Sequence, residues 1–126
     1  MLRNRRFLGA WQLVTFESRL PDGSVVRPWG DDPLGIAIWD ETGHVSAQLG
    51  PRDTSAGPYV AYYGSLEAAD VTEGTLVTHV EGASAPRLRT DQVRAFRFLS
   101  DDEMTLSPPP GPDGAVSTLL WRRLKG

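Results

Sequence analysis

Short runs of alternating apolar and polar residues, separated by turns rich in Gly, Pro and Asp, occupy most of the chain. Alternation with a period of two is typical of β-strands, because successive side chains of a strand point to opposite faces. Turn signals recur at intervals of about 8–14 residues, which predicts an antiparallel sandwich or barrel. Nine strands are expected, at Gly9–Leu20, Ser24–Arg27, Ile36–Asp40, His44–Leu49, Tyr59–Ala68, Thr75–Glu81, Gln92–Leu99, Met104–Ser107 and Ala115–Leu124.

The rest of the chain is expected to form turns, loops and one short helix. The helix is expected at Asn4–Leu8, before the first strand. The Pro-rich stretch Pro108–Gly114 cannot enter the interior of a sheet, because proline lacks the N–H that a ladder needs. No stretch resembles an interdomain linker, and 126 residues are too few for two domains of ordinary size. The whole chain, residues 1–126, is therefore expected to form one domain.

Several strands carry apolar side chains on both faces. In Gln92–Leu99, for example, Arg94 and Phe96 share one face while Val93 and Arg97 share the other. A strand with two partly apolar faces needs a burial partner on each side. A closed barrel with a lined cavity, whose outer face is covered by the helix or by a second subunit, meets that need. We therefore favour an all-β fold, a small antiparallel up-and-down β-barrel rather than a sandwich, and expect a homodimer.

Composition narrows the function classes. The 13 Lys and Arg residues against 16 Asp and Glu residues leave a formal net charge of −3, which argues against nucleic-acid binding. No apolar run approaches the roughly 18 residues of a membrane-spanning helix, so no membrane partner is expected. The absence of cysteine excludes disulfides and thiolate chemistry. The basic and then apolar start reads as a mature N-terminus rather than a secretion signal, and a cytoplasmic location is expected.

Six sequence stretches carry a family resemblance. They read FLGAWQLVTFE from residue 7, PWGDDPLGIAIWDETGHVSAQL from 28, YVAYYGSLE from 59, THVEGASAP from 78, DQVRAFRF from 91 and MTLSPPP from 104. In this order and at this spacing they resemble the bacterial lipocalin-like domain family, with Trp39 where the family usually has Tyr and Val45 where it usually has Met. The resemblance implies a calycin-type β-barrel, whereas the family is a poor guide to chemistry.

The first of these stretches contains Gly-X-Trp at Gly9–Trp11, which resembles the lipocalin signature. In that fold, the resemblance implies, the Trp closes the base of the barrel and a basic residue of the last strand packs across it. Arg122 and Arg123 stand where that basic residue would come from. A guanidinium over an indole ring is favourable by about 0.5–2 kcal/mol.

The two histidines are the first candidates for chemistry, because histidine titrates near neutrality. His44 shares a strand face with Gln48, and His79 shares one with Glu81. If those faces point inward, they form a polar cluster able to orient a carbonyl or move a proton. If they point outward, both histidines are solvated. No metal site is expected, because nothing in the spacing of the histidines and glutamates demands one.

Arg94 is the second candidate, since among aromatic neighbours it could bind a carboxylate or an enolate. Glu17 could be its structural partner instead, and Arg97 takes its place if the register is opposite, because a one-residue shift inverts every side chain. With Arg94, we place His79 and Tyr62 in a candidate catalytic set. The residues expected to bind a ligand are Trp39, His44, Gln48, Tyr62, Tyr63 and Phe96.

Three functions remain open at this stage. The first is binding of a small, largely apolar molecule with one polar group in the barrel cavity. The alternative is a cofactor-free cyclase, isomerase or dehydratase that acts on a polyketide-like or terpenoid intermediate of secondary metabolism. The third is a structural or interaction module whose barrel is filled by its own side chains. No cofactor is expected, because phosphate-binding and dinucleotide-binding motifs are absent.

Overall fold

The computed structural model describes residues 1–126 and contains nine strands, as the sequence predicts. Every strand overlaps an expected one, and the differences are confined to the ends, where hydrogen bonding rather than residue type decides the boundary. The strands are β1 (Gly9–Arg19), β2 (Val25–Val26), β3 (Leu34–Trp39), β4 (His44–Gly50), β5 (Val60–Glu67), β6 (Glu73–Ala83), β7 (Asp91–Phe98), β8 (Glu103–Ser107) and β9 (Val116–Arg123).

The expected helix at Asn4–Leu8 is wrong in type. Only a 3-10 turn, η1 (Arg5–Phe7), forms there, and two further 3-10 turns are η2 (Thr54–Ala56) and η3 (Pro86–Leu88). The Asn4 side chain caps η1 by accepting the Arg6 N–H, while Gly9 has a φ of 116° and already starts β1. The backbone N–H groups of Phe7 and Leu8 donate to the carbonyls three residues earlier, those of Asn4 and Arg5, which is the bonding pattern of a 3-10 turn. No helix in the structure has the length and apolar character needed to cross a membrane.

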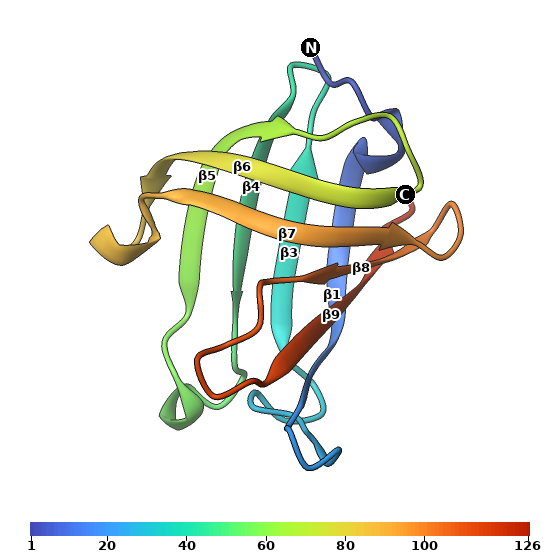
Figure 1. The fold of residues 1–126 in the computed structure, drawn as a ribbon. Helices are drawn as coiled ribbons and strands as arrows, with labels where there is room; N and C mark the ends of the chain where they lie inside the picture. The colour runs from blue at the N-terminus through green and yellow to red at the C-terminus, as the bar shows by residue number, and fades with distance from the viewer.

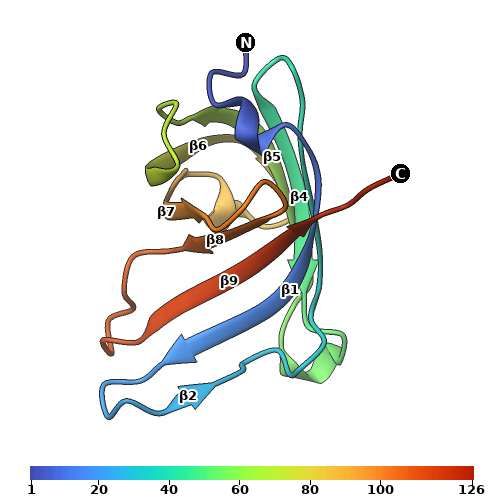
Figure 2. The same ribbon diagram turned by 90° about the vertical axis from the view of Figure 1, so that its right-hand side faces the viewer.

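All nine strands belong to one antiparallel sheet, ordered β2-β1-β3-β4-β5-β6-β7-β8-β9, and β1 also pairs with β9. The β1–β9 pairing closes eight of the strands into a barrel, and β2 extends the sheet beside β1 as a short extra strand. Figure 1 shows β6 and β7 crossing in front of β3, β4 and β5, and Figure 2 shows β1 and β9 running side by side with β2 below them. The predicted up-and-down β-barrel is therefore confirmed.

One end of the barrel is closed by aromatic packing. Phe7 of η1 is fully buried, and its ring centroid lies 5.2 Å from those of Trp39 and Phe96 and 4.9 Å from that of Phe98. Trp11 is also fully buried, and its Nε1–H donates to the Phe7 carbonyl at 2.9 Å. Through these contacts the turn η1 covers the base of the barrel.

Arg123 completes this closed end. Its guanidinium carbon lies 4.2 Å from the centre of a Trp11 ring, and its nitrogens donate to the carbonyls of Arg6 and Leu8. The neighbouring Arg122 points to the other face of β9 and pairs with Glu103 at 3.1 Å. The plug that the family resemblance implies is thus present, with Arg123 as the basic residue.

A bulge in β1 decides which of its side chains face inward. The register with β9 shifts between Leu13 and Thr15, so Val14 is an extra residue. Trp11 and Leu13 are buried before the bulge, and the inward positions after it are even-numbered, with Phe16 lining the interior. Glu17 therefore lies outside the barrel, where it pairs with Arg27 at 3.1 Å. The expected alternative pairing of Glu17 with Arg94 is wrong.

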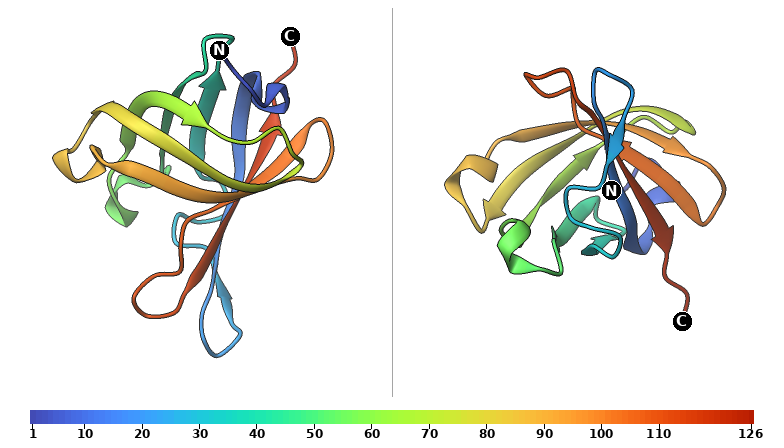
Figure 3. Two further views of the ribbon diagram at one scale, coloured as in Figure 1. Left: turned by 45° about the horizontal axis from the view of Figure 1, so that its top comes forward. Right: turned by 90° about the horizontal axis from the view of Figure 1, so that it is seen from below.

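The loops extend from the barrel and do not add a layer to it. The hairpin that joins β6 to β7 through η3 projects at the left of both panels of Figure 3. The turn between β2 and β3 carries Trp29, and the Pro-rich stretch 108–114 joins β8 to β9 outside the sheet, as expected. These loops lie near the interior cavity, because Trp29, Leu88 and Pro108 are among its lining residues.

Candidate ligand-binding cavity

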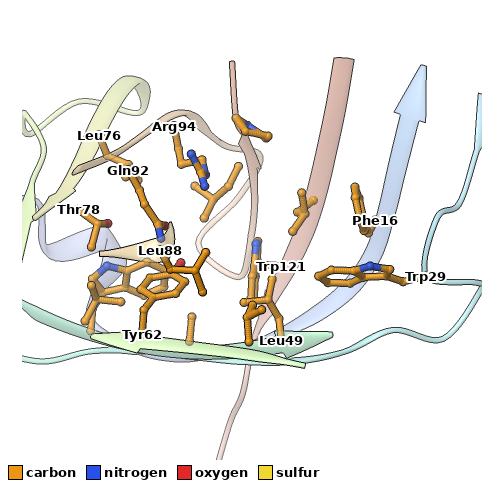
Figure 4. A pocket seen from close by; sticks show the side chains of 17 residues that line it. Phe16, Trp29, Leu49, Tyr62, Leu76, Thr78, Leu88, Gln92, Arg94 and Trp121 are labelled. Atoms are coloured by element: carbon orange, nitrogen blue, oxygen red, sulfur yellow. The ribbon is translucent and has the colours of Figure 1, made fainter. Parts of the chain in front are cut away.

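The barrel encloses a cavity of about 210 Å³, lined by 17 residues of which 13 are hydrophobic. Every barrel strand contributes to the wall, because alternate residues of each strand point inward. Figure 4 shows the side chains gathered around the space. They are Phe16, Trp29, Ala37, Trp39, Val45, Leu49, Val60, Tyr62, Leu76, Thr78, Leu88, Gln92, Arg94, Leu106, Pro108, Leu119 and Trp121.

One end of the cavity is aromatic. Phe16 of β1 and Trp29 of the β2–β3 turn meet edge to face, with ring centroids 4.8 Å apart and an interplanar angle of 81°. Figure 4 places this pair together, away from Arg94, Gln92, Thr78 and Tyr62. The aromatic end offers apolar surface that suits the hydrocarbon part of a ligand.

The polar groups come from three neighbouring strands. Gln92 and Arg94 lie two residues apart on β7, so they share its inward face. Thr78 of β6 is the partner of Gln92 in the ladder, and Tyr62 comes from β5 next to β6. Figure 4 shows these four side chains turned toward the same space. The barrel therefore gathers its polar groups on one side of a largely apolar cavity.

Arg94 and Tyr62 influence each other's titration. Burial raises the pKa of the Tyr62 hydroxyl, and the positive charge of Arg94 lowers it by a smaller amount. Burial also lowers the pKa of the Arg94 guanidinium, while Tyr62 acts in the opposite direction. At neutral pH the site therefore contains a neutral phenol beside a guanidinium, which stays protonated in proteins.

Two buried donors in the cavity wall have no partner. The Nε1–H groups of Trp39 and Trp121 are inaccessible to solvent and form no hydrogen bond. The indole N–H of Trp11, in contrast, is satisfied by the Phe7 carbonyl. A buried polar group without a partner costs about 1–3 kcal/mol, so native proteins keep few of them. An acceptor reaches either nitrogen only if neighbouring side chains move, because neither nitrogen has accessible surface.

Among the residues predicted for the site, Trp39, Tyr62 and Arg94 line the cavity. Phe96 also points inward, but it is buried among the aromatic rings of the closed end. His44, Gln48 and Tyr63 are exposed on the outer face, and His79 lies there as well. Tyr62 and Tyr63 could not both face the cavity, because neighbours on a strand point to opposite sides. The expectation that His44, Gln48 and Tyr63 bind the ligand is wrong for this cavity, and so is the catalytic role expected of His79.

The outward polar residues have surface partners instead. His79 lies between Glu67 of β5 and Asp91 of β7, with both ring nitrogens 3.1 Å from a carboxylate oxygen. His44 contacts the Thr42 hydroxyl at 2.7 Å, and the Tyr59 hydroxyl donates to Gln48 Oε1 at 2.9 Å. The structure contains no group of three or more His, Asp or Glu side chains that could hold a metal ion.

Several residues that line the cavity were not predicted from the sequence, although the spacing of two of them to an expected inward residue indicates their position. Gln92 precedes Arg94 by two residues and therefore shares its face. Trp121 precedes Arg123, one of the two arginines expected to pack across Trp11, by the same interval. Phe16 carried no such signal, because the bulge at Val14 reverses the faces of β1.

Comparison with known proteins supports the fold. A model of the lipocalin-like domain family matches residues 8–58. A solved structure described as a de novo designed fluorescence-activating β-barrel is similar with a TM-score of 0.56 and 18% sequence identity, over 98% of this chain and 100% of that one. At this identity the likeness shows the fold alone. No curated protein matches the chain.

Proposed function

We propose that this chain, which is a lipocalin-like β-barrel, binds one small, largely apolar molecule with a polar group inside its cavity. The observation that carries the proposal is the cavity itself, whose largely apolar wall brings polar side chains together on one side, namely Tyr62, Thr78, Gln92 and Arg94. A barrel filled by its own side chains would have no space of about 210 Å³. The interaction-module hypothesis therefore has less support than ligand binding.

The cavity volume limits the size of the ligand. A cavity of about 150 Å³ in another protein holds a benzene molecule. The 210 Å³ here leaves room for one ring, or a short chain of similar size, together with a small polar substituent. The aromatic pair of Phe16 and Trp29 suits the apolar part, and the side chains of Gln92 and Arg94 suit an acceptor on the substituent.

The alternative function, a cofactor-free cyclase, isomerase or dehydratase, has one observation in its favour. The Tyr62 hydroxyl lies in the cavity within the electrostatic influence of Arg94, an arrangement that could stabilise an enolate and deliver a proton. The third member of the predicted catalytic set, His79, lies outside. No His, Asp or Glu lines the cavity, so a general base with a pKa near neutrality is lacking and we favour binding.

Native mass spectrometry of the protein purified from its own host tests the proposal. We expect a discrete adduct above the 13.8 kDa polypeptide that is lost on denaturation. Leu119→Trp and Val60→Trp each enlarge a side chain that lines the cavity, from different strands, and should abolish the adduct. Leu120→Trp is the matched control, because it adds the same ring one residue further along β9, on the outer face.

The result depends on folded variants, which thermal unfolding followed by circular dichroism will verify. Two independent filling variants are used so that a folding failure in one leaves the other informative. Wild-type protein without an adduct, even after incubation with host extract, would show the proposed function to be wrong. An adduct retained by a folded filling variant would place the ligand elsewhere and contradict it equally.

A further inference from the structure

Building on the proposed function, we infer that the ligand is an anion, a small aromatic or short-chain carboxylate whose carboxylate group pairs with Arg94 inside the cavity. Arg94 is the one charged residue among the lining residues, and no Asp or Glu accompanies it. The cavity therefore has a positive charge without a counter-ion, and a ligand is the group that can supply one.

Arg94 is the one arginine of the chain that is both half-buried and without an acidic partner, since the other arginines without an ion pair are exposed, namely Arg3, Arg19, Arg87, Arg89 and Arg97. Arg5, Arg6, Arg27, Arg52, Arg122 and Arg123 each form an ion pair with an Asp or Glu. Arg94 forms none, and its one hydrogen bond runs from Nη1 to the Val93 carbonyl, at 2.8 Å. A guanidinium has five N–H donors, so most of those of Arg94 stay available.

Burial makes this unpaired charge costly. A half-buried guanidinium loses part of its hydration, and proteins normally offset that loss with a carboxylate or a carbonyl cluster. The same burial lowers the pKa of Arg94. A carboxylate is the matching group, because it accepts two parallel N–H···O bonds from the guanidinium fork.

The surrounding polar groups favour an acceptor over a donor. The Gln92 amide and the hydroxyls of Thr78 and Tyr62 can each donate a hydrogen bond, as the Arg94 guanidinium does. A cationic ligand would meet Arg94 and find no carboxylate. The cavity thus has the donor excess that carboxylate oxygens need, while Phe16 and Trp29 offer apolar surface for a ring.

Calorimetry with a matched pair of probes tests the inference. We use trans-cinnamate and its neutral amide, cinnamamide, which have nearly the same shape and differ in charge. Wild-type protein should bind cinnamate at least about tenfold more tightly than cinnamamide. Arg94→Gln should weaken cinnamate binding by about 10- to 100-fold, the range for a hydrogen bond to a charged group, and leave cinnamamide nearly unchanged. Arg94→Lys should restore part of the affinity, because it keeps the charge but loses the fork.

Arg97→Gln is the control, because Arg97 is exposed on the outer face of the same strand. It should bind both probes as wild type does. A second measurement uses the indole N–H signals of the four tryptophans in ¹H–¹⁵N spectra. Cinnamate should shift the signals of Trp39 and Trp121 and leave that of Trp11, which is bonded to Phe7 behind the closed end.

Three results would overturn the inference: equal affinity for the two probes, no binding of cinnamate at millimolar concentration, or an unchanged cinnamate affinity in Arg94→Gln. None of them removes the proposed function, which stands or falls with the native adduct and its loss in the filling variants. An adduct that is lost from the filling variants and released as a neutral or cationic molecule would keep the proposed function and overturn the anionic ligand.

Discussion

Trp11 shows how much a single side chain contributes to this fold. Its ring is fully buried, its N–H donates to Phe7, and the guanidinium of Arg123 packs across its face. The preceding Gly9 has a φ of 116°, a left-handed conformation that side chains disfavour, and a Cβ there would lie 3.1 Å from Arg123 Nη1. The Gly-X-Trp spacing therefore reflects one local arrangement at the base of the barrel.

We predict that Trp11→Ala lowers the free energy of unfolding by about 3–5 kcal/mol, the range for truncating a buried aromatic residue. Urea denaturation measures the change. Trp29→Ala is the control, because Trp29 is only partly buried at the other end of the cavity and should cost less. An unchanged denaturation midpoint for Trp11→Ala would contradict the role of Trp11 as the plug.

Gly64 is a second position where the backbone leaves no room for a Cβ atom. It lies beside the bulge between β5 and β6, and a Cβ built on it would overlap the backbone oxygen of His79. At Gly82 the obstacle to a Cβ is the side-chain ring of Tyr63, and that ring is exposed and able to turn.

Gly64→Ala should therefore destabilise the protein by about 1–3 kcal/mol or more, the cost of overpacking against a backbone that must move. Gly82→Ala should cost clearly less, because a surface side chain can move aside. Thermal unfolding of the two variants under the same conditions gives the comparison. Equal losses would show that the close approach at Gly64 is not the cause.

At the scale of the strand, bulges and cross-strand contacts hold the barrel in register. Val14 in β1 and Glu81 in β6 are extra residues relative to the partner strands, and each reverses the inward and outward faces beyond it. On the outer surface, His79 of β6 connects Glu67 of β5 with Asp91 of β7. Both contacts are hydrogen bonds from the ring only when the imidazole is protonated, because the neutral ring has a single N–H.

The His79 contacts predict a specific pH dependence. Hydrogen bonding to Glu67, and then to Asp91, raises the pKa of His79 above its ordinary value. The protonated form is favoured by folding, so this stabilisation is complete below the unfolded pKa of about 6.5 and is lost as pH rises through the higher folded pKa. Stability measured across that window should fall with increasing pH.

An NMR titration of His79 tests this prediction directly. Glu67→Gln and Asp91→Asn should each move the titration midpoint of His79 downward, and the change should be larger for Glu67→Gln. Glu81→Gln is the control, since Glu81 lies on the same strand and does not contact the ring. A midpoint that is the same in all four proteins would refute the assignment.

At the scale of the whole molecule, the barrel closes where β1, near the start of the chain, pairs with β9, near its end. Residues of β1 pair with residues of β9 from Trp11↔Arg123 to Arg19↔Val116. Without that pairing the sheet would remain open. We therefore predict one domain that unfolds in one cooperative transition, with coincident curves from tryptophan fluorescence and far-UV circular dichroism. Two separated transitions would contradict it.

The outer surface of the barrel carries apolar side chains that a homodimer would bury. Large apolar side chains such as Ile38 on β3, Tyr63 on β5 and Val93 on β7 remain exposed. The homodimer predicted from the sequence would bury part of this surface, so sedimentation velocity at micromolar concentration should give about twice the mass of the 13.8 kDa chain. A 13.8 kDa species at every concentration would make the prediction wrong.

The sequence by itself determined the strands, their antiparallel order and the base of the barrel. Gly, Pro and Asp turns delimit each strand, and short turns place sequential strands side by side, because neighbouring antiparallel strands need only a tight connection. The pair of Trp11 and a late arginine was also accessible, since the Gly-X-Trp context and the basic end of the last strand are visible as residue types. Local chemistry was sufficient for these features.

Only the tertiary structure decided which face of each strand points inward. Alternation places His44 and Gln48 on one strand face, and Gln92 and Arg94 on one face of another strand. It does not tell which face points inward: the first pair lies outside the barrel, and the second lines the cavity. In β1 the bulge at Val14 makes even the grouping change along the strand. A polar side chain in a strand is stable either in water or beside other polar groups in a cavity, so its residue type does not reveal whether it points outward or inward. The closure of the sheet and the positions of its bulges decide that.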